Sequence, residues 1–156
     1  MATEFESGSS VYLWFDRIIE IDKGKKARAI KSIRLTESYF IDHFPKFPIV
    51  PGMLQLEGLI QLGSWLIKIS HSFRYDVIPL SIKGLDFRKY VRPSDELIFE
   101  VEILSLNSDN AIVKAKAIVD GKIVSNVKEI VFKYLPLTTK QATREKECFH
   151  QLLGNL

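Results

Sequence analysis

The pattern of apolar and polar residues divides the chain into extended segments that precede and follow one long helix. Two runs of β-branched and aromatic residues, 11–21 and 26–35, flank a turn pattern at Asp22–Lys25 and predict an opening hairpin. Residues 53–70 contain no proline, are mostly apolar and follow Pro51-Gly52. This pattern predicts a largely buried helix.

Four extended segments follow the helix and predict consecutive antiparallel strands. They span residues 79–90, 96–106, 111–120 and 122–134. Apolar side chains alternate cleanly from Ala111 to Val119, and Asp120-Gly121 is a strong signal for a two-residue hairpin turn. Two strands, one helix and four strands in this order favour an α+β fold with an antiparallel sheet over parallel βαβ units.

The segment after residue 137 predicts a second, short amphipathic helix. One face would carry Ala142, Glu145, Phe149 and Leu152, with Gly154 as a stop. Because this face is short and only partly apolar, we expect the helix to dock on its own domain and not on a partner. The chain as a whole predicts one domain, 1–156, with a core at 11–134 and a tail at 135–156.

Polar residues on the long helix form a single narrow stripe. They are Glu57, Gln61, Ser64 and Lys68, at steps of four, three and four. The simpler interpretation is a solvent-facing edge of a buried helix, and the alternative is part of a functional site.

Composition adds limits on the class of protein. The 156 residues are 46% hydrophobic and 26% charged, as in an ordinary globular domain, and the net charge of +3 comes from dispersed basic residues. We therefore expect no nucleic-acid partner and a modest preference for acidic ones. Residues 1–10 lack the features of a secretory signal, and the apolar stretch 58–67 is too short to span a bilayer, so we expect a cytoplasmic protein without integral membrane contact.

Three other residues receive simple interpretations. The single cysteine, Cys148, cannot form an internal disulfide, which fits a reducing compartment, and we interpret it as a bystander thiol. His71 and His150 lack partners at a useful spacing and are interpreted as surface residues.

Candidate chemistry is concentrated between residues 43 and 57, where three prolines at intervals of three enforce a rigid loop before the helix. His43 can take up a proton near neutral pH, and Glu57 can donate or accept one. Gly52 at the helix start lets a main-chain N–H approach a ligand closely, where the positive helix end favours charge on an oxygen. These groups suit the removal of a proton α to a carbonyl and the loss of a group from the β carbon.

The pattern His-Phe-Pro-x-x-Pro-x-x-Pro-Gly-x-Leu-x-x-Glu from His43 to Glu57, with Gln61 four residues further on, resembles the signature of bacterial 3-hydroxyacyl-[acyl-carrier-protein] dehydratases of the FabZ type. It is similar also to the FabA type, which typically has Asp at the position of Glu57. The resemblance extends over about residues 11–134 and implies a hotdog fold, in which a curved antiparallel sheet wraps a central helix.

The resemblance also implies roles for individual residues. His43 would remove the α proton, and Glu57 of a partner chain would protonate the departing hydroxyl. Gly52 and Met53 would bind the thioester oxygen and substrate, and Gln61 would orient a catalytic group. The implied protein is a homodimer with composite sites, and many members assemble further into trimers of dimers. No metal or redox cofactor is implied, because the substrate arrives on the phosphopantetheine arm of an acidic acyl carrier protein.

Arg88, Lys89 and Arg92 have two interpretations, a basic rim that binds this carrier or solvated charges at the end of a strand. Trp65 and Phe87 are interpreted as core or tunnel lining.

The chain departs from the family pattern around the predicted site. Asp42 and Lys46 replace usual glycines, Phe47 stands where a small or polar residue is common, and Tyr90 and Ser94 replace a usual proline and glycine. These changes suggest a specialised member, for example in a polyene or polyketide pathway.

Two alternatives to the dehydratase remain. One is a hotdog thioesterase, whose carboxylate would activate water against the thioester. The other is a non-catalytic subunit that binds acyl chains or carrier protein, because a hotdog fold hosts several chemistries.

Overall fold

The structure, a computed structural model, describes residues 2–3 and 11–153. One antiparallel sheet has the strand order β3-β4-β6-β7-β8-β5. Its strands are β3 (Arg17–Asp22), β4 (Lys26–Ser32), β5 (Tyr75–Phe87), β6 (Glu96–Leu106), β7 (Asn110–Val119) and β8 (Lys122–Pro136). Two short strands, β1 (Ala2–Thr3) and β2 (Val11–Tyr12), pair with each other.

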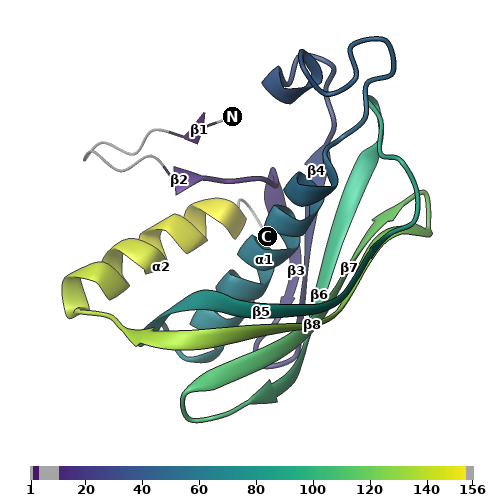
Figure 1. The fold of residues 1–156 in the computed structure, drawn as a ribbon. Coiled ribbons are helices and arrows are strands. Elements are labelled where there is room, and N and C mark those ends of the chain that lie inside the picture. Colours follow the sequence, from purple (N-terminus) through teal and green to yellow (C-terminus); the bar gives the residue numbers. More distant parts are fainter. Residues whose placement is uncertain (1, 4–10, 154–156) are drawn as a thin grey trace.

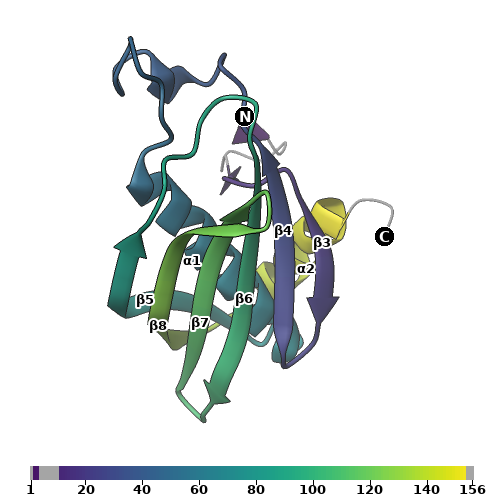
Figure 2. The same ribbon diagram turned by 90° about the vertical axis from the view of Figure 1, so that its right-hand side faces the viewer.

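The sheet curves around helix α1 (Gly52–Ser70), which lies in its hollow (Figure 1). Figure 2 shows the strands side by side from β5 to β3, with α1 behind them. This arrangement is the hotdog fold, so the predicted α+β architecture is confirmed.

Two glycines allow α1 to approach the sheet closely. A methyl group on Gly58 would lie 2.6 Å from the ring of Phe99, and one on Gly63 would lie 3.2 Å from the ring of Phe132. The leucines of α1 between these contacts are fully buried, and each contributes roughly 1.5–3 kcal/mol by leaving water. The position of α1 is therefore fixed by packing along most of its length.

The first predicted strand, 11–21, is divided in the structure. Trp14 and Phe15 leave the extended run between β2 and β3 and are almost completely buried. The hairpin resumes where the N–H of Asp16 donates to the carbonyl of Ile30 at 2.8 Å. Burial of two large aromatic side chains thus overrides local strand preference.

Strand β5 begins at Tyr75, four residues before the predicted start at residue 79. Within the described part of the chain it is an edge strand whose one partner is β8. The strand accommodates Pro79 because an edge position and the shift in pairing between Pro79 and Ser81 relieve the loss of a ladder N–H.

Helix α2 (Thr139–Leu153) confirms the predicted second helix and packs beside the C-terminal half of α1 (Figure 1). The ring of Phe149 lies against Trp65 and Phe73 at 5.9 and 5.6 Å between centroids. The helix therefore docks on its own chain, as expected, whereas the predicted stop at Gly154 lies outside the described residues. Burial and the nearby charge of Glu145 raise the pKa of the Cys148 thiol, which disfavours a reactive thiolate.

His71 corrects an expectation, because it is not a surface residue. Its ring packs edge-on against Tyr75 and Tyr134 at 5.4 and 4.7 Å, and Nε2 is buried. The cluster forms because α1 ends beside the place where the start of β5 pairs with the end of β8. His150, by contrast, is exposed as predicted.

No helix within the described residues is long and apolar enough to cross a membrane.

Candidate active site

His43 lies in the loop between the 3₁₀ turn η1 (Ser38–Phe40) and α1. Its main-chain N–H donates to the carbonyl of Tyr39 at 3.0 Å, and its Nδ1 lies 2.9 Å from the carbonyl oxygen of Ile49. Because a carbonyl only accepts, Nδ1 carries the proton and Nε2 carries the lone pair. Nε2 is therefore the ring nitrogen that can take up a proton.

Glu57 lies one turn into α1 and is held by its own helix. Gln61 Nε2 donates to Glu57 Oε1 at 2.9 Å, while Gln61 Oε1 accepts the main-chain N–H of Trp14, also at 2.9 Å. The second bond fixes which end of the amide faces the carboxylate. Gln61 thus holds the Glu57 carboxylate in one orientation relative to Trp14.

All four residues of the stripe on α1 are partly exposed, and Gln61 and Lys68 also bind residues outside the helix, so the stripe is more than a solvent-facing edge. Glu57 and Gln61 connect to Trp14, and Lys68 Nζ pairs with Glu145 of α2 at 2.9 Å and with Asp76 of β5 at 3.1 Å. The Ser64 hydroxyl returns to its own helix and donates to the carbonyl of Ile60. Trp14, before β3, and helix α2 thus contact this side of α1.

The amino terminus of α1 points into the same region as the loop of His43. Pro51 precedes the helix, and the first main-chain N–H groups of a helix have no partner within it. A side chain at Gly52 would meet the ring of Phe87 at 2.8 Å, so only glycine allows that ring to cover the helix start. The side chain of Met53 beside it is 65% exposed. The N–H groups at Gly52 and Met53 thus form an electropositive helix end next to an apolar surface.

Aromatic and basic side chains form the mouth of the site. The ring of Phe47 contacts Tyr90 edge-on at 5.5 Å, and the guanidinium of Arg92 lies 4.9 Å above it. A cavity of about 590 Å³ is lined by Phe87, Arg88, Lys89, Tyr90 and Arg92. The structure therefore places the three predicted rim residues together, although Arg88 is also paired with Asp86 at 2.6 Å. Trp65, in contrast, belongs to the core.

The replaced glycines differ in their backbone requirements. Neither Asp42 nor Lys46 has a positive φ. Phe44, by contrast, has a φ of 60°, and Ser94 has a φ of 77°. The left-handed residue in the loop of His43 is thus Phe44, and of Asp42, Lys46 and Ser94 it is Ser94 whose φ favours glycine.

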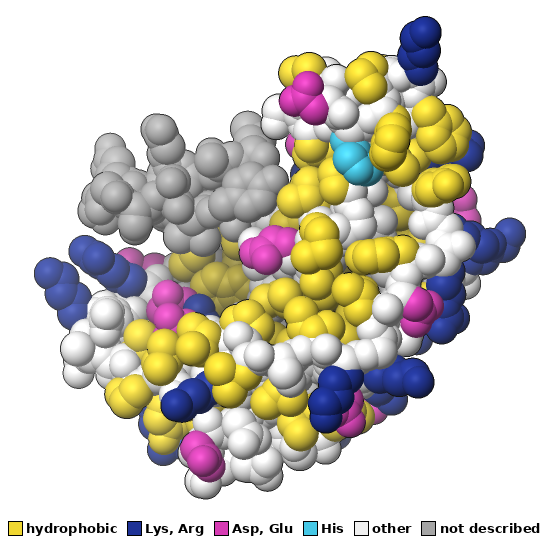
Figure 3. Space-filling view, viewed as in Figure 1, with side chains coloured by type: hydrophobic (Ala, Val, Ile, Leu, Met, Phe, Trp, Pro, Cys, Tyr) yellow, Lys and Arg dark blue, Asp and Glu magenta, His cyan; other side chains and the backbone are white. Residues whose placement is uncertain are grey.

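Figure 3 shows a histidine side chain on this face of the molecule, surrounded by hydrophobic side chains. Several large apolar residues of the loop and its neighbours are exposed: Leu35, Ile41, Phe44, Phe47, Met53, Phe87 and Tyr90. The site therefore lies within an extended apolar surface.

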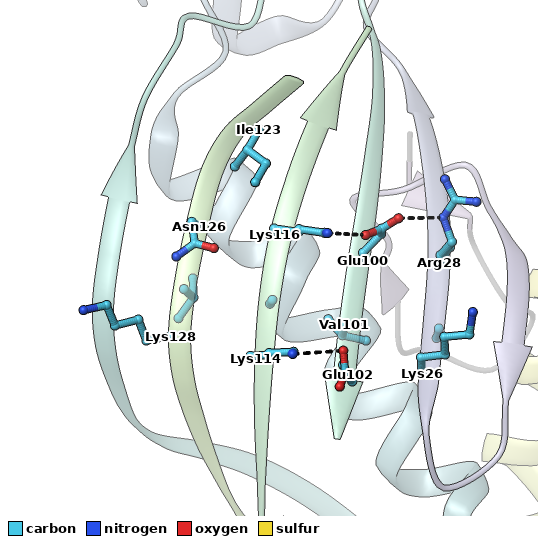
Figure 4. Close-up of a pocket in the computed structure, with 13 residues that line it drawn as sticks. Lys26, Arg28, Glu100, Val101, Glu102, Lys114, Lys116, Ile123, Asn126 and Lys128 are labelled. Atoms are coloured by element: carbon cyan, nitrogen blue, oxygen red, sulfur yellow. Dashed lines mark ion pairs between the residues drawn. The ribbon is translucent and has the colours of Figure 1, made fainter. Parts of the chain in front are cut away.

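A second pocket, of about 540 Å³, lies on the face of the sheet that points away from α1 (Figure 4). Glu100 bridges Arg28 and Lys116 across three strands, at 3.0 Å to each, and Glu102 pairs with Lys114 at 3.1 Å. Opposite charges on neighbouring strands stabilise a solvated sheet face, so we interpret this pocket as structural.

Within residues 2–3 and 11–153, no group of three or more His, Cys, Asp or Glu side chains is placed to hold a metal ion. Three contributors to the site were not predicted: Trp14, Tyr39 and the carbonyl of Ile49. All three bond through main-chain atoms, and the bond of Trp14 is to a residue 47 positions away, so the sequence carries no local signal for them.

Comparison with solved structures shows the fold. The chain is similar to smu.793 from Streptococcus mutans UA159, determined bound to acetyl CoA, with a TM-score of 0.63 and 12% identity over 85% of this chain and 98% of that one. It is also similar to the E. coli PaaI protein, with a TM-score of 0.61 and 10% identity over 78% of this chain and 80% of that one.

Sequence comparison is more specific. A family model described as a FabA-like domain matches residues 8–128. The chain is 37% identical to a 3-hydroxyacyl-[acyl-carrier-protein] dehydratase FabZ of Caldicellulosiruptor bescii, over 72% of this chain and 81% of the relative. It is 36% identical to the FabZ of Bacillus subtilis, over 78% and 86%. The chain therefore belongs to the FabA-like family that includes the FabZ 3-hydroxyacyl-[acyl-carrier-protein] dehydratases.

Proposed function

We propose that this protein is a dehydratase that converts a carrier-bound 3-hydroxyacyl thioester to the trans-2-enoyl thioester and water. The observation that carries the proposal is the contact of His43 Nδ1 with the carbonyl oxygen of Ile49, because a neutral ring that donates there has Nε2 as its proton acceptor. The names of the FabZ relatives support the same reaction.

The proposed mechanism assigns one task to each group. His43 Nε2 removes the α proton, and the electron pair of that C–H bond forms the new double bond. The N–H groups at the start of α1, at Gly52 and Met53, stabilise negative charge on the thioester oxygen. Glu57 protonates the hydroxyl at the β carbon, whose C–O bond breaks to release water. This elimination needs no external electrons, so we propose that it uses no redox cofactor or metal.

We further propose that the site is composite, with His43 from one chain and Glu57 from its partner. Support comes from β5, a free sheet edge of 13 residues that exposes Ile78, Leu80 and Ile82. Natural proteins seldom leave such an edge uncovered, and a second copy would extend the ladder across a two-fold axis. Further assembly into a trimer of dimers is part of the same proposal.

The substrate is proposed to arrive on an acidic acyl carrier protein in the cytoplasm. Lys89 and Arg92 line the cavity beside the helix start, and Arg92 is held in place by Phe47. Cations at this position attract the carrier and the phosphate of its pantetheine arm.

The test is a coupled ultraviolet and mass-spectrometric assay with 3-hydroxyacyl and trans-2-enoyl thioesters of several lengths, on pantetheine and on carrier protein. We expect reversible loss of one water, reduced at least about 100-fold in His43→Ala and in Glu57→Gln because each removes a proton-transfer group. His150→Ala and Glu147→Gln on the exposed face of α2 are matched controls and should retain wild-type rates.

Three results would contradict the proposed dehydratase activity or its mechanism. Release of free thiol without interconversion would favour the thioesterase, and acyl binding without turnover would favour the non-catalytic subunit. Full activity in both site variants would exclude the proposed mechanism.

A further inference from the structure

Trp14 is connected to both halves of the site, although it lies in neither segment of the sequence motif. On one side its main-chain N–H bonds to Gln61, which in turn donates to Glu57. On the other side its indole packs edge-on against Tyr39 at 5.4 Å, and the carbonyl of Tyr39 accepts the main-chain N–H of His43. A continuous set of contacts thus runs from Glu57 through Trp14 to the loop of His43.

Trp14 is held rigidly enough to transmit position. Its side chain is 1% exposed, and Gly58 on α1 leaves space for the indole, because a methyl group there would collide with it. Lys31 lies 5.1 Å from the centre of the indole ring on another side and is itself buried, with Nζ 2.9 Å from Glu37. The indole is therefore packed between α1 and the start of the loop that carries His43.

From these contacts we propose that Trp14 is a positioning residue that sets the relative placement of His43 and Glu57 within each chain. The expected effect of Trp14 on turnover rests on the proposed function, whereas its effect on the placement of His43 and Glu57 rests on geometry alone. In a dimer with composite sites, His43 and Glu57 of one chain would belong to two different sites. One Trp14 would therefore contribute to the geometry of both sites.

The test compares Trp14→Leu with Trp14→Phe and Trp65→Leu. Leucine keeps an apolar but smaller side chain and offers no flat ring to Tyr39, whereas phenylalanine retains a ring. Trp65, which lies on α1 itself, is also buried and packs on Phe149 near the carboxyl end of the helix, is the matched control for loss of an indole from the core. Melting temperatures of all three variants measure the structural cost separately.

For turnover, we expect Trp14→Leu to lower kcat by about 10- to 100-fold with KM within about threefold, because misplaced groups slow the chemical step more than binding. Trp14→Phe should recover most of kcat, and Trp65→Leu should retain it at a similar melting temperature. Combination of Trp14→Leu with Gln61→Leu should be less harmful than the product of the two effects, because both interrupt one connection.

A second readout does not depend on turnover. The ¹³C signal of the Glu57 carboxylate and the ¹⁵N signals of the His43 ring should shift in Trp14→Leu and remain in place in Trp65→Leu. Unchanged signals in Trp14→Leu, or equal shifts in both variants, would overturn the proposal. A wild-type protein without dehydratase activity would instead contradict the proposed function, and the spectra would still decide the role of Trp14.

Discussion

At His43, one hydrogen bond to a main-chain carbonyl decides which ring nitrogen is available for chemistry. The motif predicts that a histidine is present but not its tautomer, because the partner is the carbonyl of Ile49 and every residue type provides a carbonyl. The prolines between His43 and α1 favour this contact, because they restrict the backbone conformations of the loop. The candidate residues are thus identified from the sequence, whereas the hydrogen bonding of the His43 ring depends on the folded loop.

Ser94 offers a test of backbone strain beside the site. Its φ of 77° places a residue with a Cβ in the left-handed region, in a turn that bonds to Ile33 and is capped by Asp95. We expect Ser94→Gly to raise the free energy of unfolding by about 0.5–1 kcal/mol, the relief of strain less the added entropy of the unfolded chain. Urea denaturation measures this change.

The matched control is Ser108→Gly, in an exposed turn whose serine is not left-handed. It should lower stability, because it adds the entropy cost without any relief of strain and removes the exposed hydrogen bond from the Ser108 hydroxyl to Asp109. Equal effects of the two substitutions would show that Ser94 is not strained.

At the scale of elements, the hydrophobic pattern predicted the order and type of the main strands and both helices, but not where each one ends. Strand β5 starts four residues early because its pairing with β8 continues past Pro79. The run before β3 breaks because Trp14 is drawn to α1 by a contact 47 residues away. Boundaries of this kind follow from pairing and packing between distant segments, which a local pattern does not contain.

The carboxyl end of α1 carries a pH dependence that arises from the same packing. Burial, and to a smaller degree the charge of Arg74, lowers the pKa of His71 below its ordinary value. The unfolded chain therefore binds a proton at His71 more readily than the folded chain. Stability from the neutral ring is complete above about pH 6.5 and is lost as pH falls from there toward the lowered pKa.

We expect His71→Phe to weaken this loss, because phenylalanine can pack against Tyr75 and Tyr134 but cannot be protonated. Urea denaturation at about pH 7.5 and about pH 5 measures the difference. His150→Asn, which changes an exposed histidine, should keep the wild-type dependence on pH. The same slope in wild type and His71→Phe would show that His71 does not cause it.

At the scale of the whole molecule, two exposed surfaces can be explained together: the edge of β5 and the apolar surface around His43. Leu80 is 59% exposed on that edge, and Ile41 is 72% exposed on the loop. A second copy paired along β5 would cover the edge and bring a new surface toward the loop, whereas a partner bound only at the loop would leave the edge open. The homodimer with composite sites that we propose would account for both surfaces at once.

Composite sites predict complementation between two inactive variants. In a mixed dimer of His43→Ala and Glu57→Gln, one site has lost both groups and the other retains both. Random mixing, by co-expression or by joint refolding, should restore about a quarter of wild-type activity, because half the dimers are mixed and each has one of two sites intact. The assay of water loss measures this recovery.

The control replaces the second partner by a chain that carries both substitutions. Mixed with His43→Ala, this chain leaves no site with a histidine, so activity should stay at the level of the separate variants. No recovery in the first mixture, with dimers confirmed by light scattering, would place His43 and Glu57 of one chain in one site. Because Trp14 links these two residues within a chain, the same experiment decides whether it connects two sites of a dimer or the two halves of one.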